Sequence, residues 1–302
     1  MSTKDTILAL CVILVWGLNF VVIKVGVTGM PPFLLAGIRF VLISFPLVLF
    51  VKPPKVDLKL LILYGMSISF GQFALLFLAI KLGMPSGIAS LVVQAQAFFT
   101  ILLGKSLGEK IKWFNTIGMI VAVIGMYVVG TGVKNIDTHG LNLTTMLLTL
   151  GAALCWGIGN ITNKLIMKDG AKVNGLSLVV WGALVPIIPF FLCSFIFEGT
   201  DNIIFSLKNI NGSTIFSIVY LSFIASIVGF VLWSNLMSRY ESSKVAPLTL
   251  VVPIIGMISS YFILGETVTG KQIVGATIVI IALLINNFGG KFLVLISEKH
   301  HA

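Results

Sequence analysis

The sequence predicts an all-α integral membrane protein with ten transmembrane helices, arranged as two inverted five-helix repeats with both termini in the cytoplasm. Three observations support this expectation: apolar stretches fill nearly the whole chain, charged residues are scarce, and blocks of the second half echo blocks of the first. Of the 302 residues, 58% are hydrophobic and only 10% are charged, whereas a soluble domain carries about 25% charged residues. Such a chain needs lipid as its solvent.

Each apolar stretch is close to the length of about 20 residues that a helix needs to cross the hydrocarbon core of a bilayer. The expected spans, in chain order, are Ile7–Val27, Phe33–Val51, Leu60–Ile80, Ser86–Gly104, Trp113–Gly130, Thr144–Met167, Gly175–Phe197, Thr214–Leu236, Val245–Leu264 and Ile273–Gly289. The first span is too long for the apolar region of a signal peptide and lacks a small-residue cleavage site. The connections are short, and Glu198–Ser213 has the composition of a turn.

The distribution of basic residues predicts the orientation. With the N-terminus inside, 14 Lys and Arg residues fall in inside segments and 4 in outside loops. Basic residues collect in the cytoplasmic loops of membrane proteins, so both termini are expected in the cytoplasm. The net charge of +10 then reflects membrane topology, and no nucleic-acid partner is expected.

Two pairs of matching blocks indicate an internal repeat. WGLNFVVIK at Trp16–Lys24 matches WGIGNITNK at Trp156–Lys164, and GEKIKWFNTIG at Gly108–Gly118 matches GETVTGKQIVG at Gly265–Gly275. Five spans per half is an odd number, so the second half enters the membrane from the opposite side. This architecture is typical of secondary transporters, whose sites lie near the midplane between the halves. We expect repeats at residues 1–134 and 135–302; the alternative is a duplication that only enlarged a helix bundle.

Four stretches carry a resemblance to a known family. They are the WGLNFVVIK start, the Pro31–Pro32 turn followed by AGIRF, the run GMPSGIASLVVQAQAFFTILLG at Gly83–Gly104, and NLMSRYESSKVAPLTLVVPIIG at Asn235–Gly256. The chain resembles the EamA group of the drug/metabolite transporter superfamily, most like bacterial exporters of O-acetylserine and cysteine. The resemblance implies a ten-helix bundle with a central cavity that exports small amino acids and their derivatives by alternating access.

Charges within the spans are rare. All ten carboxylates fall in loops or at span ends, so proton coupling through a membrane-embedded carboxylate is disfavoured, although Glu109 or Glu266 at a boundary remains an option. Arg39 is the one clear charge inside a span, and a central guanidinium would attract a substrate carboxylate through a bidentate pair. The alternative places Arg39 near the outer end of its helix, bonded to backbone carbonyls or reaching the interface.

Amide side chains complete the predicted substrate site. Asn19 shares a helix face with Trp16, and Trp156, Asn160 and Asn163 share a face in the matching helix. Amides donate to a carboxylate and accept from an ammonium, which suits a zwitterionic metabolite; the alternative role is hydrogen bonding between helices.

The remaining candidates are Gln72, Gln94 and Gln96. Gln94 and Gln96 lie about 200° apart on a helix, so they cannot both face one cavity. Gln94 is favoured because Ser90 and Phe98 share its face, but the choice between the two stays open.

The sequence also limits the other classes of function. The three cysteines lie within spans and the three histidines in a loop and the tail, so neither a metal site nor a cofactor is expected. A membrane enzyme would need a cluster of His or carboxylates, and a channel would need a continuous polar stripe. Exporters of other metabolites or drugs, and metabolite importers, remain alternatives on the same fold. We expect a monomer in which Gly118 and Gly125 permit close helix packing.

Overall fold

The structure is a computed structural model of the whole chain, and it describes all residues except 1, 46, 133–140, 168–172, 241–245 and 301–302. Within the described ranges every regular element is helical. Nine helical stretches there are long and apolar enough to cross a membrane, and Leu248–Leu264 is a shorter apolar helix. This shorter helix corresponds to the expected span at Val245–Leu264.

We group the elements into segments 1 to 10 in chain order. Their bounds are α1 (Thr3–Gly29); α2 (Pro32–Ser44) and η1 (Leu47–Leu49); α3 (Leu58–Tyr64), η2 (Gly65–Gly71) and α4 (Gln72–Lys81); α5 (Ser86–Val92), η3 (Val93–Ala95), α6 (Gln96–Gly104) and η4 (Lys105–Leu107); α7 (Trp113–Thr131); α8 (Leu143–Met167); α9 (Gly175–Gly182), α10 (Ile187–Cys193) and η5 (Ser194–Glu198); α12 (Gly212–Val219), η6 (Tyr220–Val228) and α13 (Gly229–Arg239); η7 (Ala246–Val251) and α15 (Val252–Leu264); and α16 (Gly270–His300). The expected turn at Glu198–Ser213 instead contains a further helix, α11 (Thr200–Lys208), whose first residue follows Gly199.

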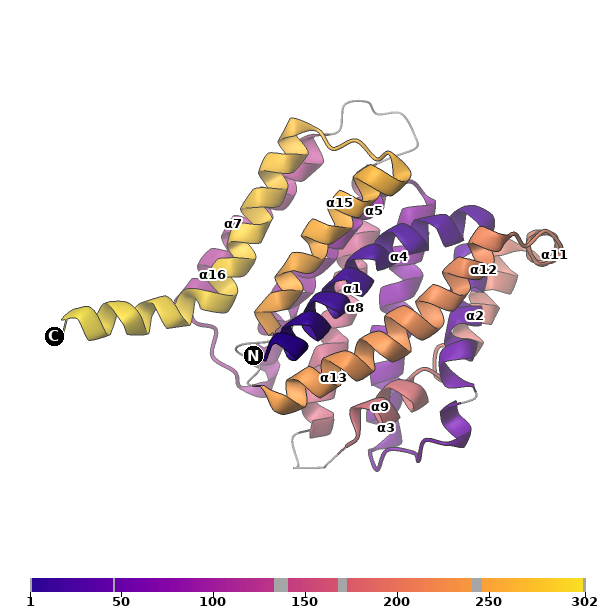
Figure 1. Cartoon of the computed structure of the whole chain (residues 1–302), viewed down its shortest axis with the longest axis horizontal. Helices are drawn as coiled ribbons and strands as arrows, with labels where there is room; N and C mark the ends of the chain where they lie inside the picture. Colours follow the sequence, from indigo (N-terminus) through magenta and orange to yellow (C-terminus); the bar gives the residue numbers. More distant parts are fainter. Residues whose placement is uncertain (1, 46, 133–140, 168–172, 241–245, 301–302) are drawn as a thin grey trace.

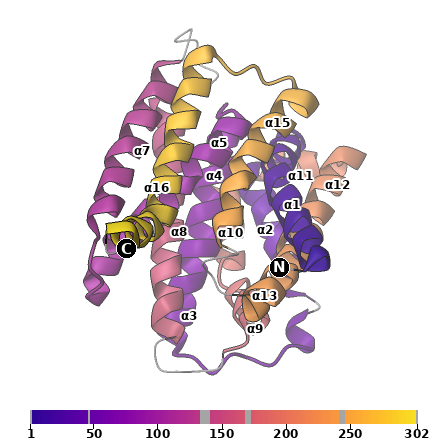
Figure 2. The same ribbon diagram turned by 60° about the vertical axis from the view of Figure 1, so that its left-hand side comes forward.

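Corresponding segments of the two halves contact corresponding partners. Segment 1 packs against α15 of segment 9 and along segment 8, whereas segment 6 packs against α6 of segment 4 and along segment 3. Segments 5 and 10 lie side by side as α7 and α16, which both views show (Figures 1 and 2). Segment 2 packs on α10 of segment 7. The main partners of segments 1 and 6 therefore correspond, although segment 1 also contacts α4 and α5 of its own half.

Irregular turns also fall at corresponding places. Segments 3 and 8 each contain a stretch of π-helix near the middle, η2 and η6, and segments 4 and 9 each contain a 3₁₀ stretch, η3 and η7. Such departures from the α-helix locally loosen the backbone ladder and often occur at functional sites.

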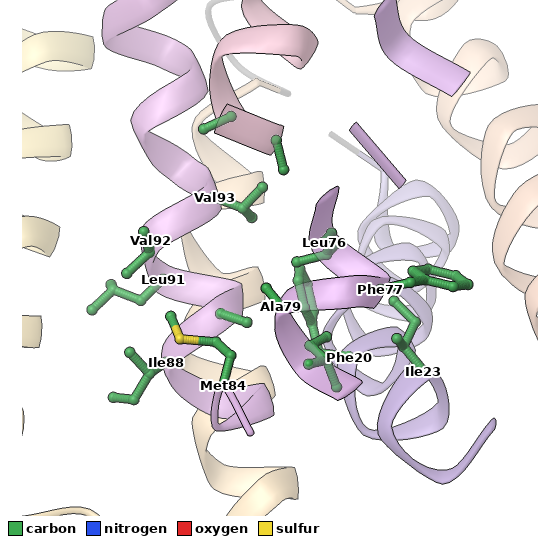
Figure 3. Close-up of a cluster of buried hydrophobic side chains, with 14 of the residues drawn as sticks. Phe20, Ile23, Leu76, Phe77, Ala79, Met84, Ile88, Leu91, Val92 and Val93 are labelled. Carbon is green, nitrogen blue, oxygen red and sulfur yellow. The ribbon is translucent and has the colours of Figure 1, made fainter. Parts of the chain in front are cut away.

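The interior is apolar and closely packed. Figure 3 shows Ile23 of α1 beside Phe77 of α4, and Phe20 of α1 and Leu91 of α5 belong to the same cluster of buried residues. Large apolar side chains also cover the outside, with Phe262 and Tyr127 more than two-thirds exposed. An apolar exterior of this kind is suited to lipid rather than water.

Candidate functional site

Arg39 lies inside the bundle, on α2. Only 4% of its surface is exposed. Its Nη2 donates to Ser226 Oγ at 3.0 Å, and Ser226 belongs to η6 in segment 8. The guanidinium therefore joins two segments within the described bundle, and the alternative of an outer-end arginine bonded to backbone carbonyls does not describe its contacts.

Three phenylalanines surround the guanidinium. Its Cζ lies 4.0 Å from the ring centre of Phe73, with the rings of Phe40 and Phe77 at 5.5 and 5.9 Å. Phe40 in turn stacks on Phe190 of α10 at 5.6 Å. A cation above an aromatic face is stabilised by the negative charge density of that face, and exclusion of water strengthens the attraction.

Two hydrogen-bond donors of this buried cation have no partner in the described protein. Nε and Nη1 of Arg39 are both shielded from solvent, and neither reaches an acceptor. A buried donor without an acceptor is costly, and charged donors more so. A charge-assisted hydrogen bond from a guanidinium N–H to a carboxylate is strong, so Nη1 of Arg39 offers an anchoring point for a carboxylate ligand.

The depth of Arg39 follows from its neighbours on segment 8. Ser226 lies near the middle of segment 8, which runs from Gly212 to Arg239. The adjacent carbonyl, of Ala225, accepts a hydrogen bond from Trp16 Nε1 at 3.1 Å. Trp16 also packs on Trp233, with the ring centres 5.3 Å apart. Trp16 and Arg39 thus reach the same level of segment 8, close to the middle of the membrane span.

Two predicted amides lie close in sequence to this level. Asn19 follows Trp16 by one helical turn, and its half-buried side chain has a shielded Oδ1 that accepts no hydrogen bond from the described protein. Gln72 is buried and directly precedes Phe73, whose ring contacts the guanidinium of Arg39. An unpaired carbonyl oxygen such as Asn19 Oδ1 suits a ligand that donates hydrogen bonds, for example an ammonium group.

Asn160 makes a second polar contact, between segments 6 and 4. Its Nδ2 donates to Gln96 Oε1 at 2.8 Å and to Thr100 Oγ1 at 3.0 Å. Gln94, two residues before Gln96, is buried and directs its Nε2 toward Thr249 O of η7 at the long distance of 3.5 Å. The two glutamines thus serve different neighbours, as their helical spacing requires.

The other two predicted residues also lie on α8. Trp156 is half-buried against the main core, and Asn163 has a shielded Oδ1 that the described protein leaves without a hydrogen bond. Trp16 contacts segment 8 whereas Asn160 contacts segment 4, so the two aromatic–amide faces expected from the repeat touch different segments. The structure joins the predicted residue Arg39 to Ser226 and the predicted residue Asn160 to Gln96.

Sequence reasoning missed Ser226 and Phe73, the closest partners of Arg39 (3.0 and 4.0 Å). Serine and phenylalanine are frequent in apolar spans, so their types alone carry no signal. In the described residues no group of three or more His, Cys, Asp or Glu side chains is arranged to hold a metal ion.

Comparison with known proteins gives one matching family model, the EamA-like transporter family, over residues 4–131 and 143–288. A Salmonella typhimurium protein named "Probable amino-acid metabolite efflux pump" is 51% identical over 290 residues, covering 96% of each chain. The Escherichia coli protein of the same name is 49% identical over the same shares. A solved crystal structure with 18% identity superposes with a TM-score of 0.62 over 97% of this chain and 99% of its own, a likeness of fold alone.

Proposed function

The chain belongs to the EamA-like transporter family, and from this premise we propose that it is a secondary transporter exporting small amino acids and their derivatives, such as cysteine or O-acetylserine, by alternating access. It is a multi-pass protein of the bacterial cytoplasmic membrane. The relatives at about half identity carry the name of amino-acid metabolite efflux pumps, which supports both the substrate class and the direction.

The proposed architecture has ten transmembrane helices in two inverted repeats, at residues 1–134 and 135–302, with both termini cytoplasmic. The matched neighbours of corresponding segments support it, as do the irregular turns at corresponding places. In both views α1 starts, and α16 leaves the bundle, in the lower half of the molecule (Figures 1 and 2). The excess of lysines in the inside segments supports placing that end in the cytoplasm.

The observation that carries the substrate proposal is the pair of unused donors on Arg39. In this proposal Nη1 donates to the α-carboxylate of the substrate, while Ser226 and the ring of Phe73 keep the guanidinium in position. Asn19 Oδ1 receives the substrate ammonium, and Gln72 lies next to the site. Opposite charges of one zwitterion thus find complementary groups.

The second polar contact belongs to the same proposal. Gln94, Trp156, Asn160 and Asn163 line the path on the side of segments 4 and 6, where the unused Oδ1 of Asn163 offers another acceptor for an ammonium. Substrate would exchange with the Asn160–Gln96 bond as the two halves move, because a bond between neutral amides is easily replaced by one to a charged group.

Export of lipophilic cations is the competing function on this fold. A cation pump needs an anionic group inside the membrane. The centre of the described bundle instead holds a positive charge, at Arg39, and the glutamates of this region lie at segment ends. The site therefore favours an anionic or zwitterionic ligand.

Efflux from proteoliposomes tests the proposal. Vesicles are loaded with labelled cysteine, O-acetylserine, threonine or phenylalanine, and release is measured with and without a pH gradient. We expect release of the small zwitterions above that from empty vesicles. The carboxylate is tested separately on detergent-purified protein: threonine should raise the unfolding temperature, since a ligand that binds the native state stabilises it, and threoninamide should not. Equal effects of acid and amide would contradict the assigned role of Arg39.

A further inference from the structure

A glutamate follows a positive-φ glycine at the end of segment 4 and again at the end of segment 9, and the backbone hydrogen bonds of the second turn span one residue more. Gly108 and Gly265 both have positive φ, at 82° and 66°, which ends the preceding helix. The next residue, Glu109 or Glu266, then donates its backbone N–H back to that helix, to Gly104 O at 3.1 Å and Ser260 O at 3.2 Å. A glycine turn thus places a glutamate directly after segment 4 and another directly after segment 9.

The two carboxylates have different long-range partners. Glu266 accepts hydrogen bonds from the backbone N–H groups of Ser86 and Gly87, at 3.0 and 3.2 Å, and from Ser86 Oγ at 3.2 Å. Ser86 Oγ also lies 2.7 Å from Ser260 Oγ on α15. A carboxylate at a helix start satisfies open N–H groups and is stabilised by the helix dipole. Glu266 therefore clamps the start of segment 4 to the end of segment 9.

Glu109, at the opposite end of segment 4, pairs with a lysine instead. Both of its oxygens lie 3.0 Å from Lys164 Nζ, and each side chain is about half exposed. The pair borders a recess of about 370 Å³, which Leu107 and Met167 also line. An exposed ion pair of this kind contributes little stability and opens readily.

The lysines are matched as well. Lys24 closes the block WGLNFVVIK as Lys164 closes WGIGNITNK. Lys24 donates to Ile80 O at 3.2 Å, and it borders a recess of about 260 Å³ that Leu264 also lines. One recess thus holds a joined lysine–glutamate pair, whereas Lys24 borders the other recess without a carboxylate among the residues that line it.

The packing of segments 4 and 9 also differs between the Glu266 end and the Glu109 end. At the Glu266 end, α5 lies against α15 so closely that a Cβ on Gly87 would be 3.0 Å from Met257 Cα, and one on Gly256 would collide with Ser90 Oγ. At the Glu109 end, α6 packs against α8 of segment 6. Segments 4 and 9 are therefore closed together at the end that Glu266 clamps.

We propose that Glu266 and Glu109 are the alternating gate locks of the transport cycle, an inference that rests on the proposed alternating access. In the present form Glu266 locks segments 4 and 9 together at one end while Glu109 rests on Lys164. In the opposite form Glu266 leaves Ser86 and Gly87 and pairs with Lys24, while Glu109 leaves Lys164 and holds α6 against η7. Each form has one clamp and one exposed ion pair, so the two forms differ little in free energy, as an alternating carrier requires.

The two glutamine substitutions are then expected to act in opposite directions. E266Q removes the clamp of the present form, whereas from the opposite form it removes only a weak ion pair. It therefore favours the opposite form, in which the Glu266 end is open. E109Q removes only the weak ion pair of the present form, but it removes the clamp of the opposite form. It therefore favours the present form, in which the Glu266 end is closed. A change of about tenfold in the ratio of the two forms is expected, equal to about 1.4 kcal/mol.

Cysteine labelling reads this ratio directly. Cys11, Cys155 and Cys193 are first replaced by alanine, and Ser90→Cys is added as a reporter, because Ser90 is completely buried between α5 and α15. A membrane-impermeant maleimide is applied to intact cells from the periplasmic side. The labelling rate should rise about tenfold with E266Q and fall by a similar factor with E109Q.

Glu198 provides the matched control. Its carboxylate also accepts backbone N–H bonds at a helix start, from Phe33 and Leu34 of α2 at 2.6 and 3.1 Å, but it lies between segments 2 and 7. E198Q should leave the labelling rate unchanged. Equal shifts in E198Q and E266Q, or shifts of E266Q and E109Q in the same direction, would overturn the proposal.

Two further features keep the test decisive. If E266Q fails to accumulate, Ser86→Ala keeps the backbone N–H bonds to Glu266, removes the hydroxyl contacts with Glu266 and Ser260, and should raise labelling by a smaller factor. Because Glu109 is about half exposed, we expect E109Q to fold, and its labelling can be measured independently of E266Q. Unchanged labelling in E109Q would also overturn the proposal. Because labelling needs no substrate, a wrong substrate class would show in the efflux assay and leave this result intact.

Discussion

At the scale of single residues, Arg39 combines burial, aromatic contact and unused donors. A charged side chain within a membrane needs compensating partners, and the described protein supplies one hydroxyl and three rings. The geometry leaves Nε and Nη1 available. These are the donors that distinguish a guanidinium from an ammonium, which is a point charge without a fixed fork.

Replacing Arg39 by lysine tests this distinction. R39K keeps the charge but loses the planar set of N–H donors and the close approach of the guanidinium to the Phe73 ring. We therefore expect the kcat/KM of efflux to fall about tenfold or more, equal to at least about 1.4 kcal/mol. The thermal unfolding of the variant in detergent shows whether it still folds. A well-folded R39K protein with parental efflux would place Arg39 outside the substrate site.

The asparagines permit a contrasting prediction. Asn160 donates two bonds to segment 4, so N160A should lower the free energy of unfolding by about 0.6–2 kcal/mol per lost bond. Asn19 Oδ1 has no such bond to lose, so N19A should reduce efflux while the unfolding temperature stays near the parental value. Parental efflux in a normally folded N19A protein would contradict the role assigned to Asn19.

At the scale of elements, the α7–α16 pair shows how small residues set helix distance. The prediction of close packing at Gly118 and Gly125 is confirmed: an added Cβ would lie 3.1 Å from Ala282 O and 2.9 Å from Val279 N respectively. Gly275 of α16 is tighter still, with Val129 N at 2.6 Å and Gly125 O at 2.7 Å. These neighbours are backbone atoms, which cannot turn aside.

Gly275→Ala should therefore force the two helices apart. We expect a loss of about 1–3 kcal/mol of stability, in the range for overpacking, seen as a lower unfolding temperature in detergent. Gly130 of α7 is the control, because an added Cβ there meets nothing within 4 Å. Gly130→Ala should be neutral or slightly stabilising, since alanine has the higher helix propensity. Equal effects of the two substitutions would show that the seam is not tight.

At the scale of the whole molecule, hydropathy predicted the all-helical membrane class and the positions of the segments, because an apolar stretch of bilayer length has few other solutions. Matching blocks such as Trp16–Lys24 and Trp156–Lys164 led to the expectation of two inverted halves, which stays a prediction. Pattern alone identified Arg39 as an unusual charge but not its partner Ser226, because periodicity shows which face of a helix is polar and not which helix that face meets.

The orientation belongs to this scale as well. Reporter domains fused to the N-terminus and to the end of α16 should both be active only as cytoplasmic reporters. The physical reason is the excess of lysines on that side of the bundle. Fusions that reported opposite sides of the membrane would contradict the odd number of spans in each repeat.

The central guanidinium has one more consequence, which concerns what the protein must keep out. A positive charge buried inside the bundle, beside the rings of Phe40, Phe73 and Phe77, repels hydronium and metal ions that enter from either face, as positive groups do in water-selective pores. A carrier built around it can let a neutral zwitterion through without a leak of ions. The cell can then discharge surplus metabolites while its membrane voltage stays intact.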